Sequence, residues 1–357
     1  MTAIPDYVVS TGDFIAEWME DAGINAAELA RRLDVTRKHV SELLSGKAPL
    51  SHSVALGLER VTGVPARIWN QYESGYRSDL ARIQERAELE AQYEQAKAFP
   101  ISYLRKYGYI VAAANDRCGI VSELLAILGV ADLRAFEATW VDSKVSYRKV
   151  AVRGATSPAM AIWLALGERH EAAQGDIPPY DRTALEALVP RLRALTAASD
   201  PVAAISEATA LLRSVGVVFC LIPPIPALGV HGATRWVGGR PLIQLSLRGK
   251  SDDQLWFTLF HELGHVLLHP DTTVFLSSDD TDAEAEADDF ASRTFVPANY
   301  RDRLPRQRNL DEVRKLAYEL GIAPSIVLGQ AQRMTTDYGW GHALKVKFDW
   351  SPAPRRN

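Results

Sequence analysis

The sequence has few cysteines, no long apolar run and no large excess of charge of either sign. Only Cys118 and Cys220 occur, and they lie outside any CxxC pattern, which excludes a disulfide framework and a thiolate metal site. The chain has no stretch of about 18 apolar residues and no basic start followed by an apolar run, so neither membrane insertion nor export is expected. These absences predict a cytoplasmic protein.

The charge balance limits how the chain can bind nucleic acid. The net charge of −4 and a pI of about 6.1 exclude a protein that coats nucleic acid along its whole length, although a local basic patch is compatible with them. Hydrophobic residues make up 47% and charged residues 24% of the sequence, as in ordinary globular proteins. With 357 residues, the chain is expected to form two or three compact units.

The patterning predicts an α+β protein that is predominantly helical and has three parts. Residues 1–75 are expected to form a bundle of short helices with a small core of apolar residues between Phe14 and Leu44, followed by a helical connector over residues 76–199. Residues 200–357 are expected to form a domain with a small β-sheet. The runs that predict its strands are residues 217–222, 230–236 and 241–247, and the main helices after them are expected at 251–269, from 281 to near 297, at 309–320 and at 324–334. Four polar residues are expected to cap the start of a helix, namely Asn25, Thr36, Ser251 and Thr281.

The strongest chemical signal is the segment FHELGH. His261 and His265 are four residues apart on a predicted helix, so that their imidazoles project side by side and can share one cation, and Glu262 follows the first of them. Two neutral imidazoles and one carboxylate suit Zn²⁺ and leave a fourth position for water, whose proton Glu262 could take as general base. The motif predicts a zinc-dependent endopeptidase. If the histidines instead had only a structural role, they would be polar surface or paired core residues.

The third metal ligand is not fixed by the residues alone. The acidic segment TDAEAEADDFASRTFVP offers Glu284, Glu286, Asp288 and Asp289, and helical periodicity does not choose among them. A solvated acidic helix face is the alternative interpretation of this run. His269, one helical step beyond the motif, is expected to have a structural role or to contact a ligand. His231 and Tyr300 are candidates for stabilising an oxyanion.

The segment FHELGHVLLH, followed by EAEADDFASRTFVP, resembles the ImmA/IrrE metallopeptidase family, and the similarity extends over about residues 200–335. The family's pattern, HExxH and then E-A-[N/D]-x-F-A leading to a proline, implies that Glu286 is the third zinc ligand and that Pro297 closes the motif. The segment SRTFVP departs from the more aliphatic run that is usual in this family. Relatives cleave a regulatory protein, often a repressor, which implies the same class of substrate here.

Residues 24–47 have helix-turn-helix spacing, with two short helices around a turn at Leu33, Asp34 and Val35. Five basic side chains concentrate here, whereas residues 1–75 as a whole carry seven basic and ten acidic residues. The candidates for DNA contact, in or near the second helix, are Arg37, Lys38, Ser41 and Lys47. A small helical protein-binding module is the alternative.

The segments TGDFIAEWMEDAGINAAELARRL and VTRKHVSELLSGKAPLS resemble the XRE superfamily, and in particular HigA-type antitoxins. The resemblance implies a homodimer on a palindromic double-stranded DNA operator and a toxin encoded nearby. Ala26 stands where many members carry a DNA-contacting Gln. The sequence therefore predicts a transcriptional regulator with a zinc endopeptidase domain that acts on a regulatory protein, in this chain or a partner, and that could serve as an antitoxin. The alternatives are a non-enzymatic antitoxin and autorepressor whose C-terminal domain binds a toxin, and a plain repressor with an inert domain.

Overall fold

The computed structural model describes residues 8–141, 158–172, 175–246, 248–269, 274–276 and 282–348. Contacts divide the chain into two compact units, residues 1–92 and residues 93–357. The domain boundaries expected near residues 75 and 199 remain predictions.

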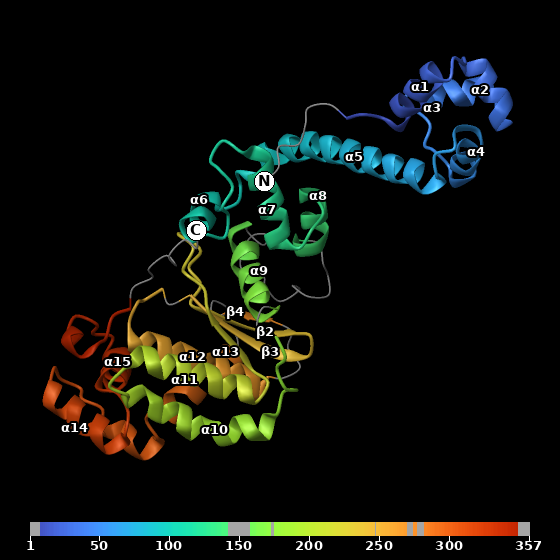
Figure 1. Ribbon diagram of the computed structural model, residues 1–357. Helices are drawn as coiled ribbons and strands as arrows, with labels where there is room; N and C mark the ends of the chain where they lie inside the picture. Colours follow the sequence, from blue (N-terminus) through green and yellow to red (C-terminus); the bar gives the residue numbers. More distant parts are fainter. Residues whose placement is uncertain are drawn as a thin grey trace. The chain divides into compact units, whose positions relative to one another are not determined.

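The first unit is built from short helices, and one long helix follows them (Figure 1). The apolar residues expected to form its core do pack into one cluster, either buried or at its edge. Its helices are α1 (Thr11–Asp21), α2 (Ala26–Leu33), α3 (Arg37–Leu44), α4 (His52–Thr62) and α5 (Ala66–Ala96), the last of which continues into the second unit.

Local capping explains where the short helices begin. The side chain of Asn25 accepts a hydrogen bond from the backbone N–H of Glu28 at 3.0 Å, and Thr36 accepts one from His39 at 3.1 Å, as the sequence predicts. Asp34 adopts a left-handed conformation with φ of 55°, which ends α2 and makes the turn to α3. These contacts set the two helices at the spacing of a helix-turn-helix motif.

The second unit contains a small sheet surrounded by helices (Figure 1). The segment from Glu137 to Val141 forms a short π-helix after α8. The α-helices of this unit are α6 (Ile101–Lys106), α7 (Arg117–Leu128), α8 (Leu133–Phe136), α9 (Pro158–Ala172), α10 (Arg182–Ala194), α11 (Pro201–Ser214), α12 (Asp252–Leu268), α13 (Asp282–Phe295), α14 (Leu310–Leu320) and α15 (Pro324–Thr335).

The sheet has four strands in the order β1-β3-β2-β4, namely β1 (Val218–Leu221), β2 (Gly232–Val237), β3 (Arg240–Leu245) and β4 (Val274–Leu276). β1 runs parallel to β3, whereas β2 pairs antiparallel with both β3 and β4. The three predicted strands are confirmed. The fourth was not predicted, because a three-residue strand is too short to have a recognisable alternation of apolar and polar residues.

Helix α9 belongs to the layer that covers the sheet, although the sequence places it in the connector. Figure 1 shows α9 on one side of the sheet and α11 and α12 on the other. The buried Arg235 of β2 donates hydrogen bonds to the carbonyl of Leu164 at 2.9 Å and to Gln244 of β3 at 3.1 Å. A Cβ atom at Gly167 would lie 1.9 Å from the Gln244 side chain, so glycine allows α9 to approach this closely. Helix α9 therefore packs against the sheet of the second unit.

The predicted fold class, α+β and predominantly helical, is confirmed. No helix among the described residues is long and apolar enough to cross a membrane. One cap differs from expectation, because Ser251 begins α12 without a side-chain hydrogen bond. The cap expected at Thr281 and the C-terminal tail from residue 349 lie outside the described residues.

Candidate functional site

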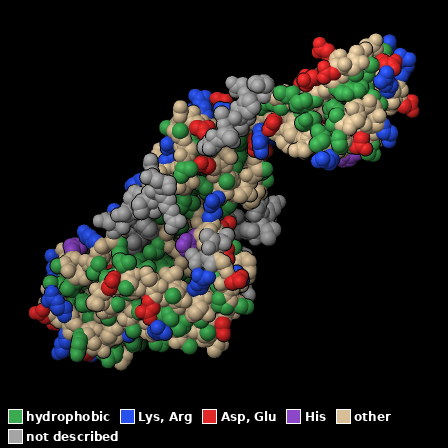
Figure 2. All heavy atoms as spheres, in the orientation of Figure 1, with side chains coloured by type: hydrophobic (Ala, Val, Ile, Leu, Met, Phe, Trp, Pro, Cys, Tyr) green, Lys and Arg blue, Asp and Glu red, His purple; other side chains and the backbone are tan. Residues whose placement is uncertain are grey.

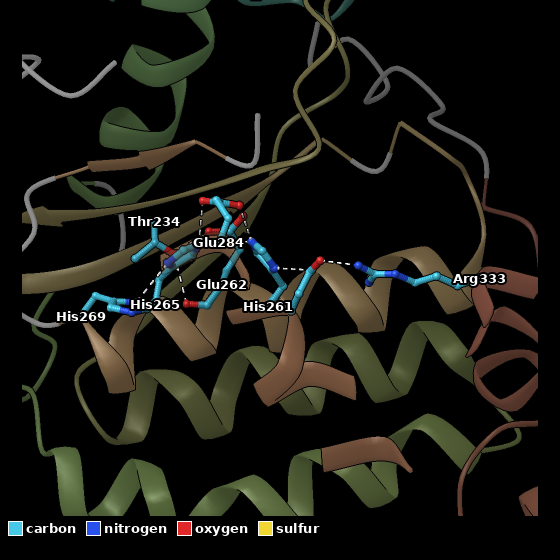
Figure 3. A network of polar contacts seen from close by, with 8 residues as sticks. Thr234, His261, Glu262, His265, His269, Glu284 and Arg333 are labelled. Carbon is cyan, nitrogen blue, oxygen red and sulfur yellow. Dashed lines mark hydrogen bonds and ion pairs between the residues drawn. The ribbon is translucent and has the colours of Figure 1, made fainter. Parts of the chain in front are cut away.

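The two motif histidines lie side by side on α12, which packs against β2 and β3. Leu255, Leu259 and Leu263 are buried in the main core of the unit and fix the rotation of the helix. His261 and His265 are 6% and 1% exposed, and their Nε2 atoms are 3.2 Å apart (Figure 3). The helix therefore presents both imidazoles to the same point.

Helix α13 supplies the carboxylate at that point, and the carboxylate is that of Glu284. One oxygen of Glu284 is 3.1 Å from Nε2 of His261, and the other is 3.1 Å from Nε2 of His265. Gly264 allows the two helices to pack closely, because a Cβ atom there would lie 3.0 Å from the Cα atom of Ala287. His261, His265 and Glu284 are the group of metal-ligating side chains found among the described residues, with ligand atoms within 4.8 Å of one another.

Glu286, the third ligand implied by the family resemblance, is not placed with the two motif histidines. Its side chain is 62% exposed and contacts Nε2 of His269 at 2.7 Å. The reason is helical geometry: two residues along a helix correspond to a rotation of about 200°, so Glu284 and Glu286 point away from each other. Asp288, four residues after Glu284, shares its face and contacts Nδ1 of His261 at 2.9 Å. Asp289 pairs with Arg293 and Arg301 instead.

Glu262 of α12 is fully buried, and its carboxylate contacts β2. Its Oε2 atom accepts a hydrogen bond from Thr234 at 2.7 Å, while Oε1 has no hydrogen-bond partner among the described residues (Figure 3). Burial raises the pKa of Glu262 to about 7, although His261 and the bond from Thr234 both lower it. A carboxylate with a pKa near neutrality can both accept and return a proton at physiological pH.

The charges around the imidazoles favour a positive charge at the point where they meet. Burial disfavours the charged ring of His261, but hydrogen bonds with Asp288 and Glu284 outweigh burial and raise its pKa to about 10. For His265 burial prevails and its pKa is lowered. Burial also opposes ionisation of Glu284 and Asp288, yet their contacts with the histidines, joined for Asp288 by a bond from Arg333, hold the pKa of each at about 2. The two acids are therefore ionised in the folded protein.

This donor set fits zinc. A tetrahedral Zn²⁺ centre with bonds of about 2.0–2.2 Å has neighbouring ligand atoms about 3.4 Å apart. The separations here are 3.2 Å between the imidazole nitrogens and 3.1 Å from each nitrogen to a carboxylate oxygen. Two nitrogens and one oxygen are also the donors that zinc takes in hydrolytic sites.

A pocket of about 350 Å³ opens beside His261 and Glu284, between α12 and α15. Of the two candidates for oxyanion stabilisation, His231 lines this pocket, whereas Tyr300 is not among its lining residues. Tyr338, which the sequence-based reasoning missed, also lines it. No motif points to Tyr338, because it lies beyond residue 335, where the family resemblance ends. It reaches the pocket only because the segment after α15 packs there.

The candidate DNA contacts lie on the exposed side of α3 and just after it. Arg37, Lys38 and Ser41 are exposed on α3, and Lys47 is exposed in the following turn. Val40 and Leu43 are buried. In the face that Figure 2 shows, the first unit carries basic and acidic side chains interspersed, and Lys38 itself lies 3.8 Å from Glu42.

Two parts of the chain match known families. Residues 15–69 match the helix-turn-helix family model, and residues 215–328 match the model of the IrrE N-terminal-like domain, a peptidase family. No individual curated protein matches the chain significantly. The predicted fusion of an XRE-type helix-turn-helix domain with an ImmA/IrrE-like peptidase domain is thereby confirmed. The first match includes the candidate DNA contacts, and the second includes His261, Glu262, His265 and Glu284.

Proposed function

We propose that this protein is a DNA-binding transcriptional regulator whose C-terminal domain is a zinc-dependent endopeptidase acting on a regulatory protein. The observation that carries the peptidase part is the meeting of His261, His265 and Glu284 beside a buried, partly unpaired Glu262. The helix-turn-helix match at residues 15–69 supports a double-stranded DNA operator as the other partner. A regulator of this kind would act in the cytoplasm, as a homodimer on a palindromic site.

We propose Glu284, in place of Glu286, as the third zinc ligand. Glu284 contacts both imidazoles and is 15% exposed, whereas Glu286 contacts neither and is 62% exposed. Bound zinc would acidify a water molecule and polarise the scissile carbonyl. His261, His265 and Glu284 would together leave a net charge of +1 at the centre, which preserves that acidity.

Glu262 acts as the proton carrier. Its Oε1 atom has no hydrogen-bond partner among the described residues, while Thr234 holds Oε2, so one oxygen remains available to accept the proton of the attacking water. The same carboxyl group would then return the proton to the leaving amine. The pocket beside His261 and Glu284 provides room for residues of the substrate chain next to the scissile bond.

The ligand assignment is tested by a matched pair of variants, Glu284→Ala and Glu286→Ala, on the same helix. Zinc content of the purified full chain, measured by elemental analysis at neutral pH, should fall well below one ion per chain for Glu284→Ala and stay near the wild-type value for Glu286→Ala. The opposite pattern would restore Glu286 as the ligand and leave the peptidase proposal standing. A wild type that holds no zinc when zinc is supplied in slight excess would refute it.

The activity is tested by comparing new protein N-termini in cells that produce the wild type or Glu262→Gln. The amide of Gln cannot take up the proton of water, so this variant should retain zinc and operator binding but lose the cleavage products. Cleavage of a repressor, or of this chain itself, would identify the regulatory substrate. If a zinc-loaded wild type yields no products that Glu262→Gln lacks, but co-purifies with a toxin encoded nearby, the protein is a non-enzymatic antitoxin.

A further inference from the structure

The carboxylate of Asp288 contacts the imidazole of His261 on the side away from Glu284, and a residue of a third helix binds that carboxylate. Asp288 of α13 contacts Nδ1 of His261 at 2.9 Å, the ring nitrogen opposite the one that faces Glu284. The other oxygen of Asp288 accepts a hydrogen bond from Arg333 of α15 (Figure 3). Three helices thus meet in one chain of polar contacts, and that chain ends on a predicted metal ligand.

The two motif histidines differ in this support. Nδ1 of His261 contacts a carboxylate, whereas Nδ1 of His265 lies 3.3 Å from Nδ1 of another histidine, His269. His269 in turn contacts Glu286, whose side chain is largely exposed. The Asp288 side chain is 33% exposed, compared with 62% for the side chain of Glu286.

We propose that Asp288 is a positioning residue for the metal centre and that Arg333 acts through it. A carboxylate that accepts the Nδ1–H bond of a histidine fixes the tautomer that leaves Nε2 free for a metal, holds the ring in orientation and raises the basicity of the ligand. Arg333 holds the Asp288 carboxylate toward His261 through its hydrogen bond, and the guanidinium is itself held over the ring of Phe257 at 5.3 Å. This inference rests on the proposed zinc site.

The test measures zinc affinity of the full chain by competition with a chelator, independently of any cleavage. Asp288→Ala should weaken zinc binding about 10- to 100-fold. Asp288→Asn should restore much of the affinity, because its amide oxygen can still accept the bond from His261. The matched control is Asp289→Asn, which removes one negative charge from the same helix at a residue that contacts Arg293 and Arg301 rather than a histidine. The control should stay within about twofold of the wild type.

The role of Arg333 is tested by a double-mutant cycle. Arg333→Gln alone should weaken zinc binding, but it should have no further effect in the Asp288→Ala background, because a residue that acts through Asp288 has nothing left to orient. The visible spectrum of the Co²⁺-loaded protein should keep its tetrahedral form in each variant, since no ligand is lost. If the losses of zinc affinity from the two substitutions add up in the double variant, Arg333 does not act through Asp288.

The outcomes separate this inference from the proposed function. Wild-type zinc affinity in Asp288→Ala would refute the positioning role while leaving the peptidase intact. Weakened zinc binding in Asp288→Ala, combined with no cleavage by the wild type, would support the positioning role and refute the peptidase. A changed Co²⁺ spectrum in Asp288→Ala would make Asp288 a ligand, which would overturn the inference.

Discussion

Replacing Gly232 with alanine should displace Glu262, the proposed general base, while leaving the proposed metal ligands in place. Gly232 opens β2, directly across from Glu262 on α12. A Cβ atom at this position would lie 2.3 Å from Oε1 of Glu262 and 2.9 Å from side-chain carbons of Leu245 and Thr258. The backbone of Gly232 is not in the left-handed region, so alanine introduces a steric conflict and no dihedral strain.

The size of the effect follows from these distances. Non-bonded atoms reach favourable contact at about 3.5 Å, so the carboxylate must move by about 1 Å. Overpacking of this kind costs about 1–3 kcal/mol of unfolding free energy. A displacement of about 1 Å in a reacting group lowers catalysis about 100-fold. Zinc binding should survive, because the three atoms nearest the methyl group belong to Glu262, Leu245 and Thr258.

Three measurements check this prediction: the urea midpoint, the zinc content and the accumulation of cleaved N-termini in cells. Gly339→Ala is the matched control, because a Cβ atom there would be no closer than 3.5 Å to its nearest neighbour. The control should match the wild type in all three measurements. Full cleavage by Gly232→Ala with zinc retained would mean that the position of Glu262 does not limit the reaction, and the assignment of the base would be wrong.

The remaining predictions concern DNA binding, pH dependence and stability. Replacing Arg37 and Lys38 together with Ala should weaken operator binding and lower the slope of log affinity against log salt by about 2, as a salt titration would show, because each lost phosphate contact removes about 0.9; an unchanged slope in a folded variant would exclude this contact surface. In zinc-free protein the raised pKa of Glu262, about 7, means that the folded state binds more protons than the unfolded state between about pH 4.5 and 7. Glu262 therefore lowers the free energy of unfolding as pH rises through that window. The urea midpoint of Glu262→Gln should be higher than that of the wild type at pH 8 and equal to it near pH 4. Arg193 donates hydrogen bonds to three carbonyls near the ends of α13 and α14, at 2.7, 2.8 and 2.9 Å, so Arg193→Met should cost about 1–3 kcal/mol in urea unfolding. Arg191→Met, which breaks an exposed pair with Glu207, should cost less than about 1 kcal/mol.

The parts of the site that the sequence predicts are those fixed within one element. The spacing of His261 and His265 determines that their side chains lie next to each other, because a helix places residues four apart on one face whatever packs against it. The caps at Asn25 and Thr36 are similarly local, and the structure confirms them. The capping of α12 by Ser251 was predicted by the same rule and fails, since its side chain makes no capping hydrogen bond.

Features that depend on how distant segments pack were not predictable from periodicity. Helix α9 is held to the sheet by the buried Arg235, whose partners Leu164 and Gln244 are far apart in sequence. The alternation of polar and apolar residues around a strand arginine is the same whether the arginine is buried or exposed. The packing of α9 on the sheet therefore cannot be predicted from that alternation. The pocket lined by Tyr338 depends in the same way on the packing of α15.

The carboxylate proposed as the third ligand, that of Glu284, illustrates a signal that is present in the sequence and lies outside the family motif. On α12 the two motif histidines are four residues apart, and on α13 Glu284 and Asp288 are also four apart, so each helix offers two polar side chains on one face. When two helices pack closely, as Gly264 and Ala287 allow here, such pairs lie opposite each other, and Glu284 and Asp288 both reach His261. Glu286 has no acidic partner four residues later, because position 290 is Phe. This pairing of acids one turn apart supports the proposal of Glu284 as the third ligand, and the zinc content of Glu284→Ala and Glu286→Ala decides between it and the residue implied by the family motif.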